Sequence, residues 1–99
     1  MTQSLFERIK IDIERLRIAG RVPTYPDVYD PPFDVLPYYA NKGLWYTAFE
    51  EIESIERDDK VAAYVGYEIL KHLALEKDDG GNASKAAARA ARILKVLPG

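Results

Sequence analysis

The sequence predicts an all-α protein, a small four-helix bundle whose first two helices are joined by a long extended strap. Three observations predict this fold. Apolar residues recur at helical spacing in four segments, and glycine, proline or aspartate interrupts the pattern between them. The third is a stretch at residues 21–41 that holds five of the six prolines and five of the eleven aromatic residues. Because 99 residues suffice for one domain, we expect residues 1–99 to form a single globular helical domain.

The first helix is predicted over residues 4–19. Ser4 and Glu7 stand three apart, as in a capping box, and Gly20 follows as a stop signal. At 100° per residue, one apolar stripe gathers on one face of the helix: Leu5, Phe6, Ile9, Ile13 and Leu16. Ile11 and Ile18 lie on a different face, seven residues apart. A helix with two apolar faces either lies between neighbours or offers one face to another chain.

The connecting strap is predicted over residues 21–41. Its proline density argues against helix, and the three-residue repeat of polyproline II places Val22, Tyr25 and Val28 on one side. The strap either completes the core or offers its aromatic side chains to a protein partner or a small ligand. The candidate contact residues are aromatic and lie in the strap or just after it: Tyr25, Tyr29, Tyr38, Tyr39 and Trp45.

Three more helices are predicted over residues 43–57, 60–77 and 83–97. Asp58 or Asp59 is suited to cap the helix over 60–77, which is apolar around most of its circumference and is therefore predicted to be central. The sequence Asp78-Asp79-Gly80-Gly81 ends that helix, and Asn82 is suited to cap the last one. The last helix carries a stripe of four cations within about 120° of arc: Lys85, Arg89, Arg92 and Lys95.

Composition excludes several classes of chemistry. The chain has no cysteine and one histidine, which excludes disulfides, cysteine-based zinc sites and thiol nucleophiles. There is no apolar run long enough for a membrane span and no signal peptide, so we expect a cytoplasmic protein. One methionine, three side-chain amides and many charged residues suggest a thermostable protein from a thermophilic source.

The formal charge of −2 conceals an uneven distribution. Residues 1–21 carry +2, residues 22–59 carry −7, residues 60–82 carry −1 and residues 83–99 carry +4. This separation of acidic and basic residues along the chain suggests that the protein binds other molecules. The basic stripe could bind nucleic-acid phosphates or an acidic protein surface, including the acidic middle of a second copy, or could simply be solvated.

The carboxylates offer a metal-binding alternative. Glu53-x-x-Glu56, or the overlapping Glu50-x-x-Glu53, precedes Glu76-x-x-Asp79. These pairs resemble the acidic motifs of small all-α nucleotide pyrophosphohydrolases that bind Mg²⁺, and the resemblance implies Mg²⁺-dependent nucleotide hydrolysis. The chain departs from that pattern because Asp79 precedes two glycines and is predicted to have left the helix.

His72 has Glu68 and Glu76 one helical turn away on either side, so a raised pKa and a proton-shuttle role are conceivable for its imidazole. A surface ion pair is the alternative.

The sequence therefore favours a small non-enzymatic interaction module that associates with itself as a homodimer. Ile11 and Ile18, the acidic middle and the basic tail motivate this hypothesis. Nucleic-acid binding through the basic stripe and the Mg²⁺-dependent hydrolase remain alternatives. We assign no catalytic residue, no metal ligand and no cofactor, and we expect no membrane partner.

Overall fold

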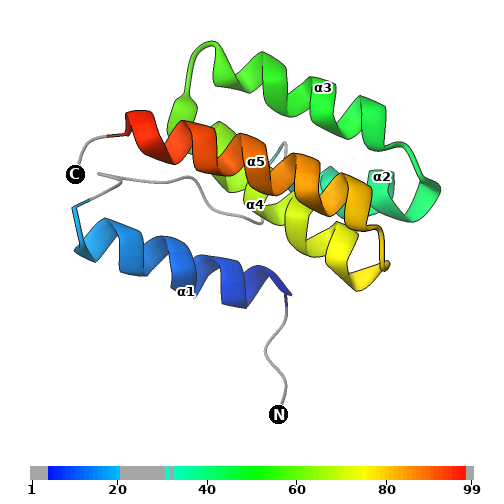
Figure 1. Ribbon diagram of the computed structural model, residues 1–99, viewed down its shortest axis with the longest axis horizontal. Coiled ribbons are helices and arrows are strands. Elements are labelled where there is room, and N and C mark those ends of the chain that lie inside the picture. The colour runs from blue at the N-terminus through cyan, green and yellow to red at the C-terminus, as the bar shows by residue number, and fades with distance from the viewer. Residues whose placement is uncertain (1–4, 21–30, 32, 98–99) are drawn as a thin grey trace.

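The computed structural model describes residues 5–20, 31 and 33–97, and within these residues the protein is all α (Figure 1). The elements in chain order are α1 (Leu5–Ile18), a 3₁₀ turn η1 (Phe33–Val35), α2 (Leu36–Lys42), α3 (Trp45–Glu56), α4 (Lys60–Glu76) and α5 (Gly80–Val96). The predicted all-α class is confirmed. The predicted count of four helices is wrong, because the described residues contain a fifth helix, α2.

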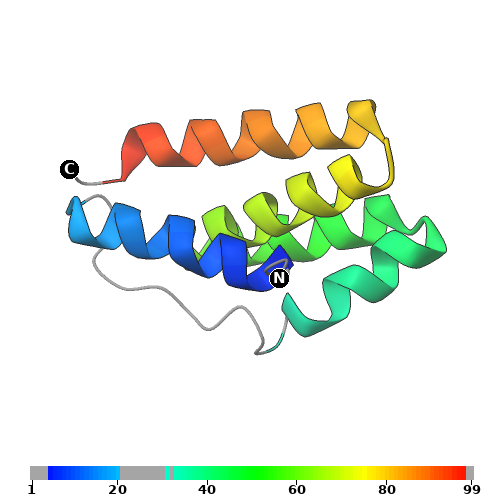
Figure 2. The ribbon, with the colours of Figure 1, turned by 90° about the horizontal axis from the view of Figure 1, so that it is seen from below.

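Helix α4 lies at the centre of the molecule. It contacts α1, α2, α3 and α5, and Figures 1 and 2 show the other helices arranged around it. Most of its side chains are buried, with Val65, Ile69 and Leu70 fully inaccessible to solvent. The prediction that the most uniformly apolar helix would be central is thus confirmed, because only a position between neighbours covers apolar groups on all sides.

The close approach of α3 and α4 depends on a glycine. Gly66 is buried on α4, and a Cβ atom built on it would lie 2.5 Å from Cδ1 of Ile52 on α3. Since Ile52 is itself fully buried, its side chain occupies the space that a larger residue at position 66 would need.

The predicted strap over residues 21–41 is wrong in its second half. Residues 33–42 form η1 and α2, and Phe33 and Leu36 are core residues with 1% and 0% of their surfaces exposed. Pro37 is the second residue of α2, where a proline is tolerated because its missing N–H would have had no partner within the helix. Residues 21–30, with the predicted contact residues Tyr25 and Tyr29, lie outside the described residues.

Aspartates and glycines set the helix ends. The side chain of Asp59 caps α4 by accepting a hydrogen bond from the backbone N–H of Ala62 at 3.0 Å, as predicted. Asp79, rather than the predicted Asn82, caps α5 and accepts from the N–H of Asn82 at 3.1 Å. The last helix therefore begins at Gly80, since Asp79 stands where its carboxylate reaches the free amides of the first turn.

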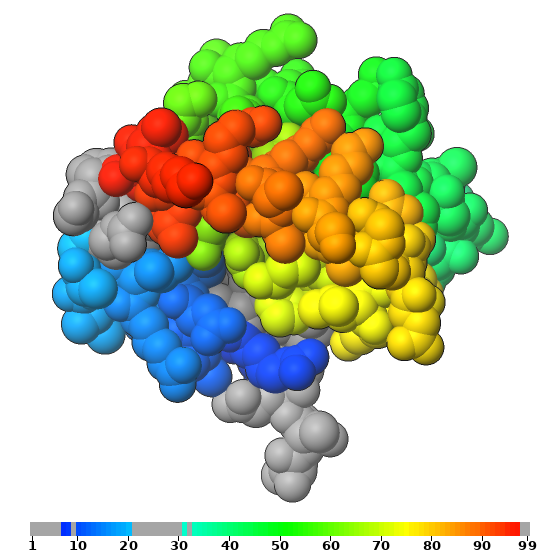
Figure 3. Space-filling view, viewed as in Figure 1, coloured from blue at the N-terminus to red at the C-terminus, as the bar shows by residue number. Residues whose placement is uncertain are grey.

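Helix α1 has two apolar faces, as predicted. Ile13 is buried and Leu16 packs against the core, whereas Ile11 and Ile18 are exposed. Ser4, the predicted cap, and the side chains of Leu5, Phe6 and Ile9 lie outside what the structure describes. In the space-filling view, α1 lies along one edge of the molecule and α5 crosses the visible face (Figure 3).

Across the described ranges, no helix is long and apolar enough to cross a membrane.

Candidate functional site

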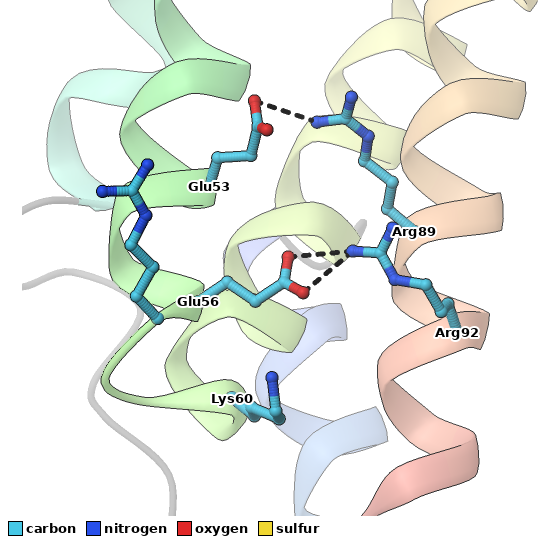
Figure 4. Close-up of a pocket in the computed structure, with 6 residues that line it drawn as sticks. Glu53, Glu56, Lys60, Arg89 and Arg92 are labelled. Carbon is cyan, nitrogen blue, oxygen red and sulfur yellow. Dashed lines mark hydrogen bonds and ion pairs between the residues drawn. The ribbon is translucent and has the colours of Figure 1, made fainter.

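The acidic helix α3 and the basic helix α5 face each other across a polar groove. Two ion pairs join them (Figure 4). Arg92 donates from Nη2 to both carboxylate oxygens of Glu56 at 2.9 Å, and Nη1 of Arg89 lies 3.6 Å from Oε2 of Glu53. Two members of the predicted basic stripe thus bind an acidic surface, and that surface belongs to the same chain.

A buried tyrosine lies beneath these ion pairs. The Tyr67 side chain is fully inaccessible, and its hydroxyl donates to Oε1 of Glu56 and accepts from Nη1 of Arg89, both at 3.4 Å. Burial raises the pKa of the Tyr67 hydroxyl above its usual value of 10.0, although Arg89 opposes the shift. The hydroxyl is therefore a neutral link between the charged groups of α3 and α5.

The groove forms an open pocket of about 370 Å³ whose lining carries an excess of positive charge. Its lining consists of two carboxylates and four cations: Glu53, Glu56, Arg57, Lys60, Arg89 and Arg92. Arg57 follows α3 and Lys60 opens α4, and neither makes an ion pair with any residue that the structure describes. Helical spacing in α5 alone could not have linked Arg57 and Lys60 to this site.

The other two members of the basic stripe lie outside the groove. The Lys85 ammonium is 4.5 Å from the centre of the Phe49 ring, a cation–π contact. Lys95 is exposed and makes no ion pair within the described part of the chain. The four cations of α5 therefore have different environments and do not form one continuous binding surface.

The exposed apolar face of α1 forms a second candidate site. Ile18 is 74% exposed and Ile11 is 38% exposed. They line a surface depression of about 350 Å³ together with Lys10, Glu14 and Arg15. This depression has an apolar floor with charged groups of both signs at its edge.

The described aromatic candidates do not share one environment. Tyr39 is partly buried and donates from its hydroxyl to Oε1 of Glu51 at 2.9 Å, and this hydrogen bond is the main cause of its raised pKa. Trp45 packs partly against the core. Tyr38 is 57% exposed, and Tyr46, which sequence reasoning did not single out, is 73% exposed.

The four carboxylates of the hydrolase hypothesis do not converge. Glu53 and Glu56 pair with arginines of α5, Glu76 lies 4.0 Å from Arg8 of α1, and Asp79 caps α5. No group of three or more carboxylate or histidine side chains suited to hold a metal ion occurs in the described segments.

The pKa of His72 is lowered, whereas its spacing from Glu68 and Glu76 in the sequence suggested a raised pKa. Burial between α1 and α4 is the largest cause, and the neighbouring Lys71 adds to it, while Glu68, 3.9 Å away, opposes it only partly. The other predicted neighbour, Glu76, pairs with Arg8 instead. A lowered pKa leaves the imidazole neutral at neutral pH.

Compared with known proteins, the chain matches no family model, and no curated protein or solved structure is significantly similar to it.

Proposed function

We propose that this protein is a non-enzymatic interaction module that binds a second copy of itself through the exposed apolar face of α1. The observation that carries the proposal is the exposure of Ile18 and Ile11, two turns apart on one side of a helix whose other side holds the buried Ile13. Burying a fully exposed isoleucine side chain contributes about 1.5–3 kcal/mol, so covering this face provides a driving force for association.

A second copy fits this face for reasons of symmetry and charge. In a two-fold dimer the same patch meets itself, so Ile11 and Ile18 of both copies would share one interface. The edge of the depression carries Lys10, Arg15 and Glu14, so each copy brings both signs of charge. The net charge of −2 keeps repulsion between copies low.

Sedimentation velocity over a range of protein concentrations tests the proposal. We expect a concentration-dependent dimer, and we expect Ile18→Lys to raise its dissociation constant at least about tenfold, equivalent to 1.4 kcal/mol. Tyr46→Lys is the matched control, because Tyr46 is as exposed as Ile18 but lies on α3. It should leave the dimer unchanged.

Two results would contradict the proposal. The first is a monomer at every concentration up to about 1 mM, the millimolar limit of weak association. The second is an Ile18→Lys variant that keeps the wild-type mass but melts at a lower temperature, which would mean that the chain covers this face itself. An Ile18→Ser variant, which adds no charge, separates loss of apolar contact from electrostatic repulsion. The cytoplasmic location and the thermophilic source stay predictions.

A further inference from the structure

We propose that the groove between α3 and α5 binds a small anion with a terminal phosphate or a pyrophosphate group. Its lining carries two more positive than negative charges, in a chain whose net charge is −2. The cations come from three places in the sequence: the end of α3, the start of α4 and the middle of α5. This site is separate from the α1 face and does not depend on self-association.

The two arginines of α5 are held in place with N–H groups to spare. Arg92 uses only Nη2 for both oxygens of Glu56, and Arg89 uses only Nη1 for Glu53 and Tyr67. A guanidinium has five N–H donors in a fixed planar arrangement. The carboxylates therefore orient both arginines while leaving Nε and one terminal nitrogen of each for a ligand, and such preorganisation lowers the entropy cost of binding.

Arg57 and Lys60 supply the charge that the carboxylates do not neutralise. Both are exposed, and neither has an ion-pair partner in the described structure. Asp58 and Asp59 stand between them in sequence but do not line the cavity, and Asp59 is turned to the first turn of α4 as its cap. Arg57 and Lys60 therefore line the pocket without a carboxylate of their own among the described residues.

The shape of the cation cluster favours a small, highly charged anion over a nucleic-acid strand. A terminal phosphate carries about −1.5 to −2 at neutral pH, whereas each phosphodiester of a nucleic acid carries −1. Polymer backbones are bound by grooves of cations that follow the strand. On α5 such a row is interrupted, because Arg89 and Arg92 are turned toward α3 and Lys85 lies over Phe49.

Titration with inorganic pyrophosphate at constant ionic strength, followed by two-dimensional amide NMR, tests the site. We expect saturable shifts at Arg57, Lys60, Arg89 and Arg92. Replacing both unpaired cations, Arg57→Ala with Lys60→Ala, should weaken binding at least about tenfold, while the fold is retained because both side chains are exposed. Lys42→Ala with Lys95→Ala removes the same charge outside the cavity and is the matched control.

A third variant separates a binding role from a structural one. Glu53→Gln removes a negative charge from the lining, so it should tighten pyrophosphate binding even though it weakens the contact to Arg89. If the cations of the groove only stabilised the fold, Glu53→Gln would not increase the affinity for pyrophosphate.

The proposal fails on any of three outcomes. One is the absence of saturable shifts up to about 10 mM pyrophosphate, well beyond the millimolar range of weak specific binding. Another is an equal loss of affinity in the control pair. The last is tighter binding of a single-stranded oligonucleotide without terminal phosphates than of pyrophosphate, which would assign the groove to nucleic acid.

Discussion

Replacing Gly66 with alanine should destabilise the protein by crowding the contact between α3 and α4. The new Cβ would lie 2.5 Å from Cδ1, 3.0 Å from Cγ1 and 3.1 Å from Cγ2 of Ile52. Carbon atoms attract best at about 3.5–4.0 Å, so all three distances are repulsive. Ile52 is fully buried, so its side chain can move only within the packed core.

Two opposing effects set the magnitude of the change. Adding a methyl group to a packed core costs about 1–3 kcal/mol, whereas alanine is favoured over glycine inside a helix by about 1 kcal/mol. We expect the free energy of unfolding to fall by about 1 kcal/mol, the difference between these two effects. For a domain of this size such a loss lowers the melting temperature by about 4–8 °C.

Urea denaturation of a double-mutant cycle isolates the contact. Ile52→Val removes Cδ1, the atom nearest the new methyl group, at a cost of about 0.5–1.5 kcal/mol on its own. In that background Gly66→Ala should cost less or become stabilising, with a coupling energy of at least about 0.5 kcal/mol. Gly80→Ala is the control, since nothing lies within 4 Å of the place that its new methyl group would take at the exposed start of α5. Equal effects of Gly66→Ala in the wild-type and Ile52→Val backgrounds would refute the packing argument.

Two further predictions concern a helix cap and a buried imidazole. Asp59→Ala should lower the free energy of unfolding by about 1 kcal/mol in urea denaturation, because the N–H of Ala62 loses its acceptor, whereas Asp58→Ala should change it little. For His72, the folded pKa is lower than the unfolded value of 6.5, so the unfolded state takes up the proton first and stability decreases as the pH falls through and below that value. In thermal melts, His72→Gln should lose less stability than the wild type as the pH falls through and below 6.5. The same dependence of stability on pH in both proteins would contradict the assignment to His72.

The central position of α4 could be predicted because it depends on the helix alone. A helix that is apolar nearly all round has to be covered on several sides, whatever its neighbours are. The same holds for Asp59, since an N-cap needs only the first turn of its own helix. The central position of α4 and the Asp59 cap could therefore be predicted from the local sequence without knowing how the helices pack.

The proline density of residues 21–41 argues against helix, but the position of each proline decides whether a helix can form, and α2 is the result. Pro37 falls in the first turn, where it costs no backbone hydrogen bond, and the helix ends at Gly43 in a left-handed conformation with φ of 73°. Tertiary contacts supply the rest: Phe33 and Leu36 are fully buried, so their packing stabilises a helix of only seven residues. That contribution is not visible in the local sequence.

The groove was only half predicted for a geometric reason. Helical periodicity placed Arg89 and Arg92 on one face of α5 but cannot tell which helix that face meets. A usable signal was present, since Glu53 and Glu56 have the same three-residue spacing as Arg89 and Arg92. Three residues correspond to about 4.5 Å along a helix axis, so the two pairs can meet side by side. The charge pattern of the sequence allows the basic stripe to meet an acidic surface on another molecule, including a second copy, whereas the structure places that surface on α3 of the same chain.

The matched spacing changes what the uneven charge distribution implies. Two of the four carboxylates of α3 and two of the four cations of α5 are paired within the chain, at Glu53–Arg89 and Glu56–Arg92. Partly exposed ion pairs of this kind contribute only about 0–1 kcal/mol each, so they add little to the stability of the fold. Charge that is paired within the chain is no evidence for a partner. Arg57 and Lys60 have no ion-pair partner among the described residues, and the proposed anion site rests on them.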